Sequence, residues 1–230
     1  MRERNYFAAM MVNTAEADGL VTGYTRSYAT VVKPMLQLID KESDVSVIAT
    51  TNMMMTSRGP MFLSDTAINI DPSAEELAKI ALMTAKTAQI FGVEPVIAMV
   101  SYSNFGSSTN QKSSKVRDAV AYLHKNHPEL IIDGEIQADF ALNPEMLREK
   151  FPFSKLAGKK VNTLIFPNLD SANITYKLMK ELYQTGSIGP IMMGMKQPVH
   201  LFQLGASVEE MVNMAAITVI HAQEKENRHK

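Results

Sequence analysis

The segment from Lys196 to Ile217 carries the residues best placed for binding chemistry. It reads KQPVHLFQLGASVEEMVNMAAI, in which a loop with Gly205 and Ser207 leads into a helix with apolar periodicity. The first N–H groups of a helix have no partner within the helix, so such a junction favours an anion. We therefore expect Gly205 and Ser207 to contact an anionic ligand.

A second polar junction follows the buried strand expected at 96–100. It precedes a helix and contains Ser101, Ser103, Asn104, Gly106, Ser107 and Ser108. Ligands of α/β sheets lie at the carboxyl ends of strands, with anions at the N-terminus of the following helix. We expect ligand contacts in this loop, and an ordinary turn rich in Ser and Asn is the alternative. The loop contains neither a Walker A sequence nor GxGxxG.

Metal and thiol chemistry receive no support from the sequence. The chain has no cysteine, which excludes disulfides, thiolate catalysis and Cys–zinc sites and fits a cytoplasmic protein. His124 and His127 lie three residues apart near a helix end, but no third ligand is close in sequence. Asp65, Asp133 and Asp139 do not have the spacing of a metal cluster either. We predict no metal site.

The composition indicates a globular protein without a nucleic-acid or membrane partner. Hydrophobic residues make up 46% of the 230 residues, which is enough for a sizeable core. A net charge of −1 gives no reason to expect nucleic acid or an anionic membrane. No apolar run approaches the roughly 20 residues of a membrane helix, and the N-terminus does not resemble a signal peptide.

Strands and helices alternate along the chain, which predicts an α/β fold with mainly parallel strands. The clearest helix spans 74–91, since Ser73 and Glu76 can form a capping box and Gly92 follows its end. We expect further helices at 5–13, 27–39, 112–127, 171–183 and from 207. Strands are expected at 19–22, 45–55, 61–64, 96–100, 130–132 and 161–166. In the helix at 171–183, the core-facing residues should be Ile174, Leu178 and Leu182.

Several segments together resemble the phosphate acetyl/butyryltransferase family. They cover nearly the whole chain and lie at 6–23, 33–38, 64–69, 95–106, 131–138, 162–174 and 189–194. Within this family the chain is most similar to the C-terminal domain of the large NADP-dependent malic enzymes. Three features carry that finer likeness: Ser103-Asn104-Phe105-Gly106, Met193-Gly194-Met195-Lys196 ahead of Pro198-Val199-His200, and the altered loop that contains Gly205.

The resemblance implies a phosphotransacetylase-like fold, related to isocitrate dehydrogenases, with two α/β domains and a cleft between them. Residues 1–44 and 195–230 would belong to the first domain, and residues 45–194 would form the second. The chain opens on a helix rather than a strand. We therefore expect the first domain to lack its N-terminal part here.

The resemblance also implies that the reactive groups of the transferases are lost. The matching transferase loop reads approximately Asp-Leu-Ser-Arg-Gly-Cys-Ser-x-x-Asp. Its Ser, Arg, Cys and Asp correspond here to Gln203, Leu204, Ala206 and Glu210. The transferase arginine neutralises phosphate and developing charge, and such a contact can carry roughly 10²–10³ in rate. Leucine cannot supply that contact.

Other charged residues remain available to an anionic ligand. Lys33 stands where the family usually has an arginine that faces phosphate, and it could attract a phosphate of CoA or be a solvated lysine of its helix. Arg26, Lys33 and Lys196 are the cations that could compensate for Leu204. His200 could touch a ligand from the same loop. Glu210 keeps the carboxylate of the family's Asp. The alternative is that it serves only as the capping-box partner of Ser207 at the start of the helix that follows.

These residues favour a catalytically silent domain that binds acetyl-CoA. The resemblance implies that it inhibits an attached NADP-dependent malic enzyme, which converts malate to pyruvate and CO₂. NADP and the divalent metal would then bind elsewhere, so we expect no cofactor in this chain. The alternatives are an active phosphate acetyltransferase and a purely structural dimerisation module. The resemblance implies a homodimer or larger assembly, with Tyr176, Met179 and Tyr183 as candidate interface residues.

Overall fold

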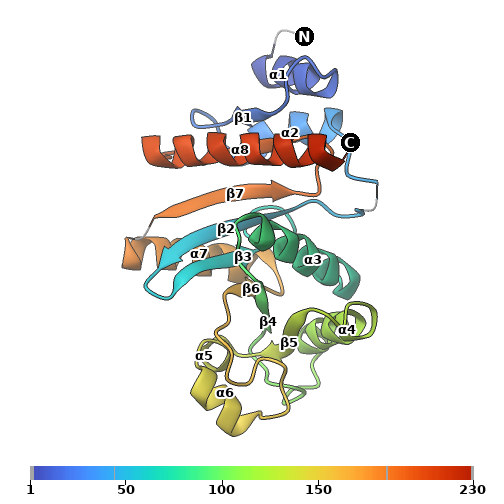
Figure 1. Ribbon diagram of the computed structural model, residues 1–230, viewed down its shortest axis with the longest axis vertical. Helices are drawn as coiled ribbons and strands as arrows, with labels where there is room; N and C mark the ends of the chain where they lie inside the picture. The colour runs from blue at the N-terminus through green and yellow to red at the C-terminus, as the bar shows by residue number, and fades with distance from the viewer. Residues whose placement is uncertain (1–2, 44, 185, 229–230) are drawn as a thin grey trace. The chain divides into compact units, whose positions relative to one another are not determined.

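The computed structural model describes residues 3–43, 45–184 and 186–228 (Figure 1). The chain divides into two compact units. Unit 1 consists of Met1–Thr50 and Ser187–Lys230, and unit 2 consists of Thr51–Gly186. The expected boundaries, at 44/45 and 194/195, differ by several residues. The difference at 187–194 has a simple cause, because a strand there packs against elements of unit 1.

Unit 1 is built from two segments that are far apart in the sequence. Its elements are α1 (Arg4–Asn13), β1 (Leu20–Thr22), α2 (Tyr28–Leu38), β7 (Ser187–Met193), β8 (Val199–Leu201) and α8 (Val208–Arg228). β1 and β8 pair in parallel, with Leu20 opposite Val199 and Thr22 opposite Leu201. α8 packs on β7, β1 and β8, and α1 packs on α2. The loop that carries Gly205 therefore connects a paired strand to a packed helix.

Unit 2 contains a twisted sheet with helices on both sides. Its strands are β2 (Ala49–Thr56), β3 (Gly59–Ser64), β4 (Val96–Val100), β5 (Ile131–Ile136) and β6 (Thr163–Ile165). Its helices are α3 (Ala74–Ile90), α4 (Gln111–Asn126), α5 (Ala138–Ala141), α6 (Pro144–Lys150) and α7 (Leu169–Tyr183). The strands of this unit lie in the order β5-β4-β6-β3-β2.

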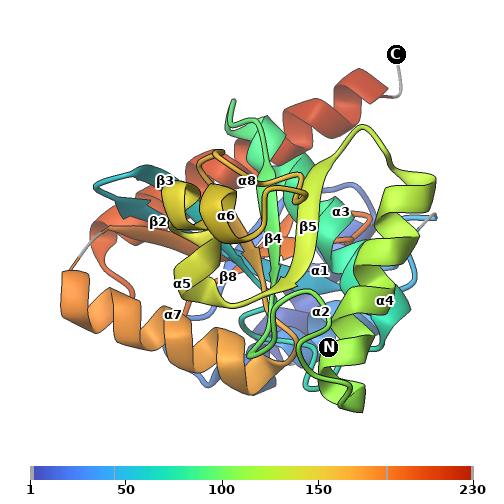
Figure 2. The same cartoon turned by 90° about the horizontal axis from the view of Figure 1, so that it is seen from below.

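The sheet of unit 2 is mainly parallel, as the alternation of elements predicts. β3, β6, β4 and β5 are parallel neighbours, and β2 runs antiparallel to β3. α3 and α4 pack on one face, whereas α5, α6 and α7 lie on the other (Figure 2). The carboxyl ends of the four parallel strands therefore meet at one edge of the sheet, and their amino ends meet at the opposite edge.

Alternation along the strands explains the two cores of this unit. Met61 and Leu63 of β3 join a cluster with Leu147 and Tyr176 beneath the α5–α7 layer. Phe62 points to the other face, where its ring lies 5.9 Å from that of Phe91. Successive side chains of a strand face opposite sides of the sheet, so both faces of β3 are buried.

The core-facing side of α7 is not the side that its apolar periodicity predicts. Ile174, Leu178 and Leu182 are 57%, 55% and 76% exposed, whereas Tyr176 is 1% exposed. The helix instead turns Ala172 and Tyr176 inward. The small Ala172 allows close approach of the helix to the sheet, and the large ring of Tyr176 fills the core. The expectations for the inward stripe and for Tyr176 as an interface residue were both wrong.

The other differences from the expected elements concern short helices and strands. α5, α6, β7 and β8 were not expected, since each is brief or lacks clear periodicity. The caps of longer helices were predicted correctly. Ser73 and Glu76 form a capping box at α3, and Gly92 adopts a positive φ of 70° just after the C-cap of that helix. Within the described residues, no helix is long and apolar enough to cross a membrane.

Candidate functional site

At the junction between β8 and α8 the start of the helix is capped by its own side chains, and the Glu210 carboxylate accepts one of the N–H groups there. The Ser207 N–H donates to Glu210 Oε2 at 2.7 Å, and the Glu210 N–H donates to the Ser207 hydroxyl at 3.1 Å. Glu210 Oε1 also accepts the hydroxyl of Ser187 at 3.3 Å. The first turn of α8 therefore carries two carboxylates, those of Glu209 and Glu210. These negative charges oppose an incoming anion at this helix N-terminus.

Gln203 and Leu204, in the loop before this helix, carry no positive charge. Leu204 is 65% exposed, and Gln203 is half-buried. Gly205 is exposed and adopts a φ of 80°, a left-handed conformation that glycine adopts without strain. The loop thus presents an apolar side chain to solvent. A contact of the arginine type cannot come from position 204.

The cations expected near this loop lie in unit 1 and have different surroundings. Arg26 is paired with Glu3, with 2.9 Å between Nη1 and Oε1. Lys33 and Lys196 are exposed, and no ion pair of either is recorded within the described residues. Burial first, and then the charge of Lys196, lower the pKa of Lys225. Lys196 and Lys225 are therefore close enough to repel each other, and Lys225 is a cation that the sequence reasoning missed.

His200 is a buried residue rather than an open ligand contact. Its side chain is 1% exposed, and its Nδ1 accepts the N–H of Met192 at 3.2 Å. The neutral ring must then carry its proton on Nε2, which lies 3.0 Å from Nδ1 of His221. Burial, followed by the charge of His221, lowers the pKa of His200 from 6.5 to about 3. Both ring nitrogens are committed inside unit 1, which leaves no atom of the ring for a ligand.

The loop at the carboxyl edge of unit 2 satisfies its own polar groups. The hydroxyl of Ser103 donates to Glu135 Oε1 at 2.9 Å and accepts the Ser108 N–H at 3.0 Å. The Asn104 N–H donates to the Ser107 hydroxyl at 2.9 Å, and the Ser107 N–H donates to the Asn104 carbonyl at 2.9 Å. Ser101, at the start of the loop, donates its N–H to the carbonyl of Ile136 at 2.9 Å. Most N–H groups of the loop therefore have acceptors within unit 2, so few of the open N–H groups expected of it remain.

Glu135, at the end of β5, is the residue that holds this loop in place. It is fully buried, and its Oε1 also accepts the Gly106 N–H at 2.9 Å and lies 3.5 Å from Nη1 of Arg117. Its backbone carbonyl accepts the Phe105 N–H at 2.8 Å. Its Oε2 has no hydrogen-bond partner among the residues described. Sequence reasoning missed Glu135 because its partners lie about thirty residues away along the chain.

The expected ligand-binding residues thus form two groups, one in each unit. Unit 2 brings together five of them in the self-bonded loop: Ser101, Ser103, Asn104, Gly106 and Ser107. Unit 1 holds the rest: Arg26, Lys33, Lys196, His200, Gly205 and Ser207. Within unit 1, Gly205 and Ser207 share the start of α8, whereas Arg26 is paired with Glu3 and His200 is buried.

Comparison with known proteins gives consistent matches over nearly the whole chain. Residues 1–219 match the family described as phosphate acetyl/butaryl transferase. The phosphate acetyltransferase of Bacillus subtilis is 38% identical over 220 residues, which are 96% of this chain and 68% of that protein. The NADP-dependent malic enzyme of Escherichia coli is 38% identical over 216 residues, which are 94% of this chain and 28% of that protein.

A solved structure agrees with these sequence matches. A phosphotransacetylase from Streptococcus pyogenes superimposes with a TM-score of 0.90 at 40% identity, covering 96% of this chain and 67% of that one. The chain spans less than a third of the length of several curated relatives and about two thirds of others. The matches thus include proteins named as transferases and proteins named as malic enzymes.

Proposed function

Because the chain belongs to the phosphate acetyl/butaryl transferase family, we propose that it binds acetyl-CoA without transferring the acetyl group. The observation that carries this proposal is the start of α8. There Leu204 is 65% exposed at the position of the transferase arginine, and Glu210 is bonded to Ser207 and Ser187. An uncharged side chain cannot stabilise the negative charge that develops during acyl transfer to phosphate. A carboxylate engaged as a helix cap is poorly placed to take a proton from the CoA thiol.

Binding can persist after these losses because it draws on other groups. CoA carries several phosphates, and Lys33 and Lys196 are exposed cations of unit 1. Burial first, and then the charge of Lys196, lower the pKa of Lys225, whose ammonium group donates to the Gln197 side chain. An anionic group near both ammonium groups would relieve their repulsion. This charge pair supports phosphate binding in unit 1.

The regulatory role follows from the second class of relatives. The malic enzyme of Escherichia coli contains a region 38% identical to this chain that covers 28% of its length. We propose that this chain belongs to such a protein and that acetyl-CoA inhibits its oxidation of malate to pyruvate and CO₂. Inhibition requires that acetyl-CoA bind an inactive state more tightly than an active one. NADP and the divalent metal would bind outside this chain.

Acyl transfer is the second candidate, and the names of the relatives favour it. Proteins named phosphate acetyltransferase match at 36–38% identity, and the Streptococcus pyogenes phosphotransacetylase shares the fold of the described residues. In this reading acetyl phosphate and CoA would give acetyl-CoA and phosphate. Because residue 204 is a leucine, a cation from another position would then have to contact the phosphate. Lys33 and Lys196 are the side chains to test.

Assembly into a homodimer or larger oligomer is part of the proposal. Ile174, Leu178 and Leu182 lie four residues apart on α7 and form an exposed apolar stripe. An apolar stripe of a helix usually faces the core of its own domain, so one that is exposed indicates a contact with a partner surface. A second copy of this chain would present the same stripe, as a two-fold interface requires. Tyr183, at 68% exposure, lies at the end of the stripe.

One pair of measurements on the purified protein separates the two functions. Calorimetry should detect saturable binding of acetyl-CoA, while an assay of thioester formation from acetyl phosphate and CoA should show no turnover. Turnover within about tenfold of an ordinary transferase would establish the second candidate instead. Absence of acetyl-CoA binding would overturn both the binding site and its regulatory role.

Charge variants then locate the site. Lys33→Glu and Lys196→Glu should each weaken acetyl-CoA binding, and the loss should be larger at low salt because the contacts are electrostatic. Lys125→Glu is the matched control, since it makes the same charge change at an exposed lysine of α4 in unit 2. If all three variants bind acetyl-CoA with equal affinity, neither lysine of unit 1 contacts the ligand.

A further inference from the structure

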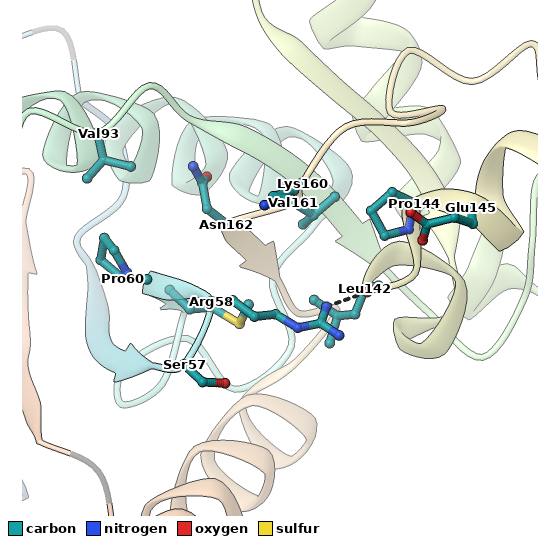
Figure 3. Close-up of a pocket in the computed structure, with 12 residues that line it drawn as sticks. Ser57, Arg58, Pro60, Val93, Leu142, Pro144, Glu145, Lys160, Val161 and Asn162 are labelled. Atoms are coloured by element: carbon teal, nitrogen blue, oxygen red, sulfur yellow. Dashed lines mark hydrogen bonds between the residues drawn. The ribbon is translucent and has the colours of Figure 1, made fainter.

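A pocket of about 440 Å³ lies in unit 2 at the amino-terminal edge of its sheet (Figure 3). β3 begins at Gly59 and β6 begins after Asn162, and both residues line the pocket. The Ser101–Ser108 loop follows the carboxyl end of β4, which runs parallel to β6. The pocket and that loop are therefore at opposite edges of the same sheet. A ligand here would be distinct from any ligand held at the carboxyl edge.

Arg58 provides the first charged group of the pocket. It lies in the turn between β2 and β3, and its side chain reaches across the pocket toward Leu142 (Figure 3). Its Nη1 donates to the Leu142 carbonyl at 2.5 Å. A guanidinium has five N–H donors, and this is the acceptor recorded for it among the described residues. The carbonyl holds the group in position, and donors remain for a ligand.

Lys160 provides the second cation, from the segment before β6. It is exposed, and no acceptor for its ammonium group is recorded in the described part of the chain. Glu145, at the start of α6, is the acidic side chain among the lining residues. Two cations and one carboxylate give the lining a formal charge of +1, that is, 2 − 1. This charge suits a ligand with one negative charge.

The remaining walls are largely apolar. They are formed by Gly59, Pro60, Met61, Val93, Leu142, Pro144 and Val161, and Ser57 adds one hydroxyl. Asn162 offers little to a ligand, because its Oδ1 accepts the Val96 N–H at 2.9 Å and its Nδ2 donates to the Glu94 carbonyl at 2.8 Å. With Asn162 engaged, the donors left to a ligand among the lining side chains are those of the two cations and the Ser57 hydroxyl. Its body would lie against hydrocarbon.

We propose that this pocket binds a small monocarboxylate with an apolar body. The volume lies within the range of about 300–1,000 Å³ that is usual for small-molecule sites. A carboxylate matches the fork of an arginine and carries one charge at neutral pH. A phosphate monoester carries about −1.5 to −2 at this pH and would leave charge uncompensated. The site stands apart from the proposed acetyl-CoA site, and either can fail without the other.

Three probes with linear apolar chains of nearly equal length test the ligand class. They are hexanoate, hexyl phosphate and hexanol, titrated into the purified protein and followed by NMR. Hexanoate should bind saturably and most tightly, because it alone combines the apolar chain with a single charge. Equal binding of hexanol would reduce the pocket to an apolar crevice. Tighter binding of hexyl phosphate, or no saturable binding of hexanoate, would overturn the proposal.

Substitutions test the two cations. Arg58→Gln and Lys160→Gln should each weaken hexanoate binding by about tenfold or more, since each removes a charge-assisted hydrogen bond. Lys159→Gln is the matched control, because this neighbouring lysine is exposed but does not line the pocket. Lys160 has no recorded partner whose loss could unfold the protein, so its variant remains informative if Arg58→Gln disturbs the turn. Unchanged affinity in Lys160→Gln, or an equal loss in Lys159→Gln, would refute the assignment.

Discussion

Acidification should destabilise unit 1 through His200 before most of its carboxylates are protonated. The ring is buried and neutral, with Nδ1 accepting the Met192 N–H and Nε2 facing His221. Protonation would remove the acceptor at Nδ1 and place a charge in the core. The perturbation is therefore a change from about pH 7 to about pH 5, applied to the wild type and to His200→Gln, which cannot take up the proton.

The magnitude follows from the pKa of His200, which is lowered from 6.5 to about 3. The folded pKa is below the unfolded one, so the unfolded chain binds more protons in the window between them. The contribution of the neutral His200 ring to the free energy of unfolding is thus complete above the unfolded pKa and is lost as the pH falls toward the folded pKa. Each unit of difference is worth about 1.4 kcal/mol, so this residue should cost about 2 kcal/mol between pH 7 and pH 5. The loss would approach about 5 kcal/mol near the folded pKa.

Urea unfolding at the two pH values measures this difference. The wild type should lose about 2 kcal/mol more than His200→Gln over the same interval, after the general acid effect common to both is subtracted. His127→Gln is the control, because it removes a partly exposed histidine. Equal losses in the wild type and His200→Gln would refute the reasoning and would show that His200 is not held neutral by its burial.

Three further outcomes follow from the contacts described above. Glu135→Ala should lower the free energy of unfolding by about 3 kcal/mol, because it leaves buried donors of the loop without an acceptor, and urea titration measures this. Gly134→Ala should cost about 3 kcal/mol or more, since the new Cβ would lie 2.5 Å from the Met99 carbonyl oxygen, whereas Gly92→Ala has open space and should cost only about 1 kcal/mol. Leu178→Glu should convert a dimer to a monomer in light scattering while leaving the melting temperature nearly unchanged. A persistent dimer would place the interface elsewhere.

The sequence predicts best where a structure depends on residues close together in the chain. The capping boxes of α3 and α8 each need only two side chains three residues apart, and both are confirmed. The mainly parallel sheet was also predictable, because the alternation of helices and strands leaves few other folds. In α7, by contrast, the apolar stripe at Ile174 gave the wrong face, since packing of Tyr176 in the core decides its orientation.

The candidate site shows the same division between local and distant contacts. The loss of the transferase arginine at Leu204 could be inferred from the sequence only through the resemblance of its loop to the transferase loop. The clamp of Glu135 on Ser103 and the pair of His200 with His221 join residues more than twenty positions apart. No local pattern marks such contacts, because tertiary packing creates them. The pocket beside Arg58 was missed for the same reason, as its walls come from four separate segments.

The internal bonding of the Ser101–Ser108 loop has a consequence for hydrogen exchange. Amide protons of surface loops usually exchange with solvent quickly, because few of them are bonded. Here the N–H groups of Asn104, Phe105, Gly106, Ser107 and Ser108 all have acceptors within the loop or on β5. Their deuterium uptake should therefore resemble that of a strand even in the free protein. Slow exchange at Phe105 and Gly106 reports the clamp by Glu135, and only a further slowing on addition of acetyl-CoA would report the ligand.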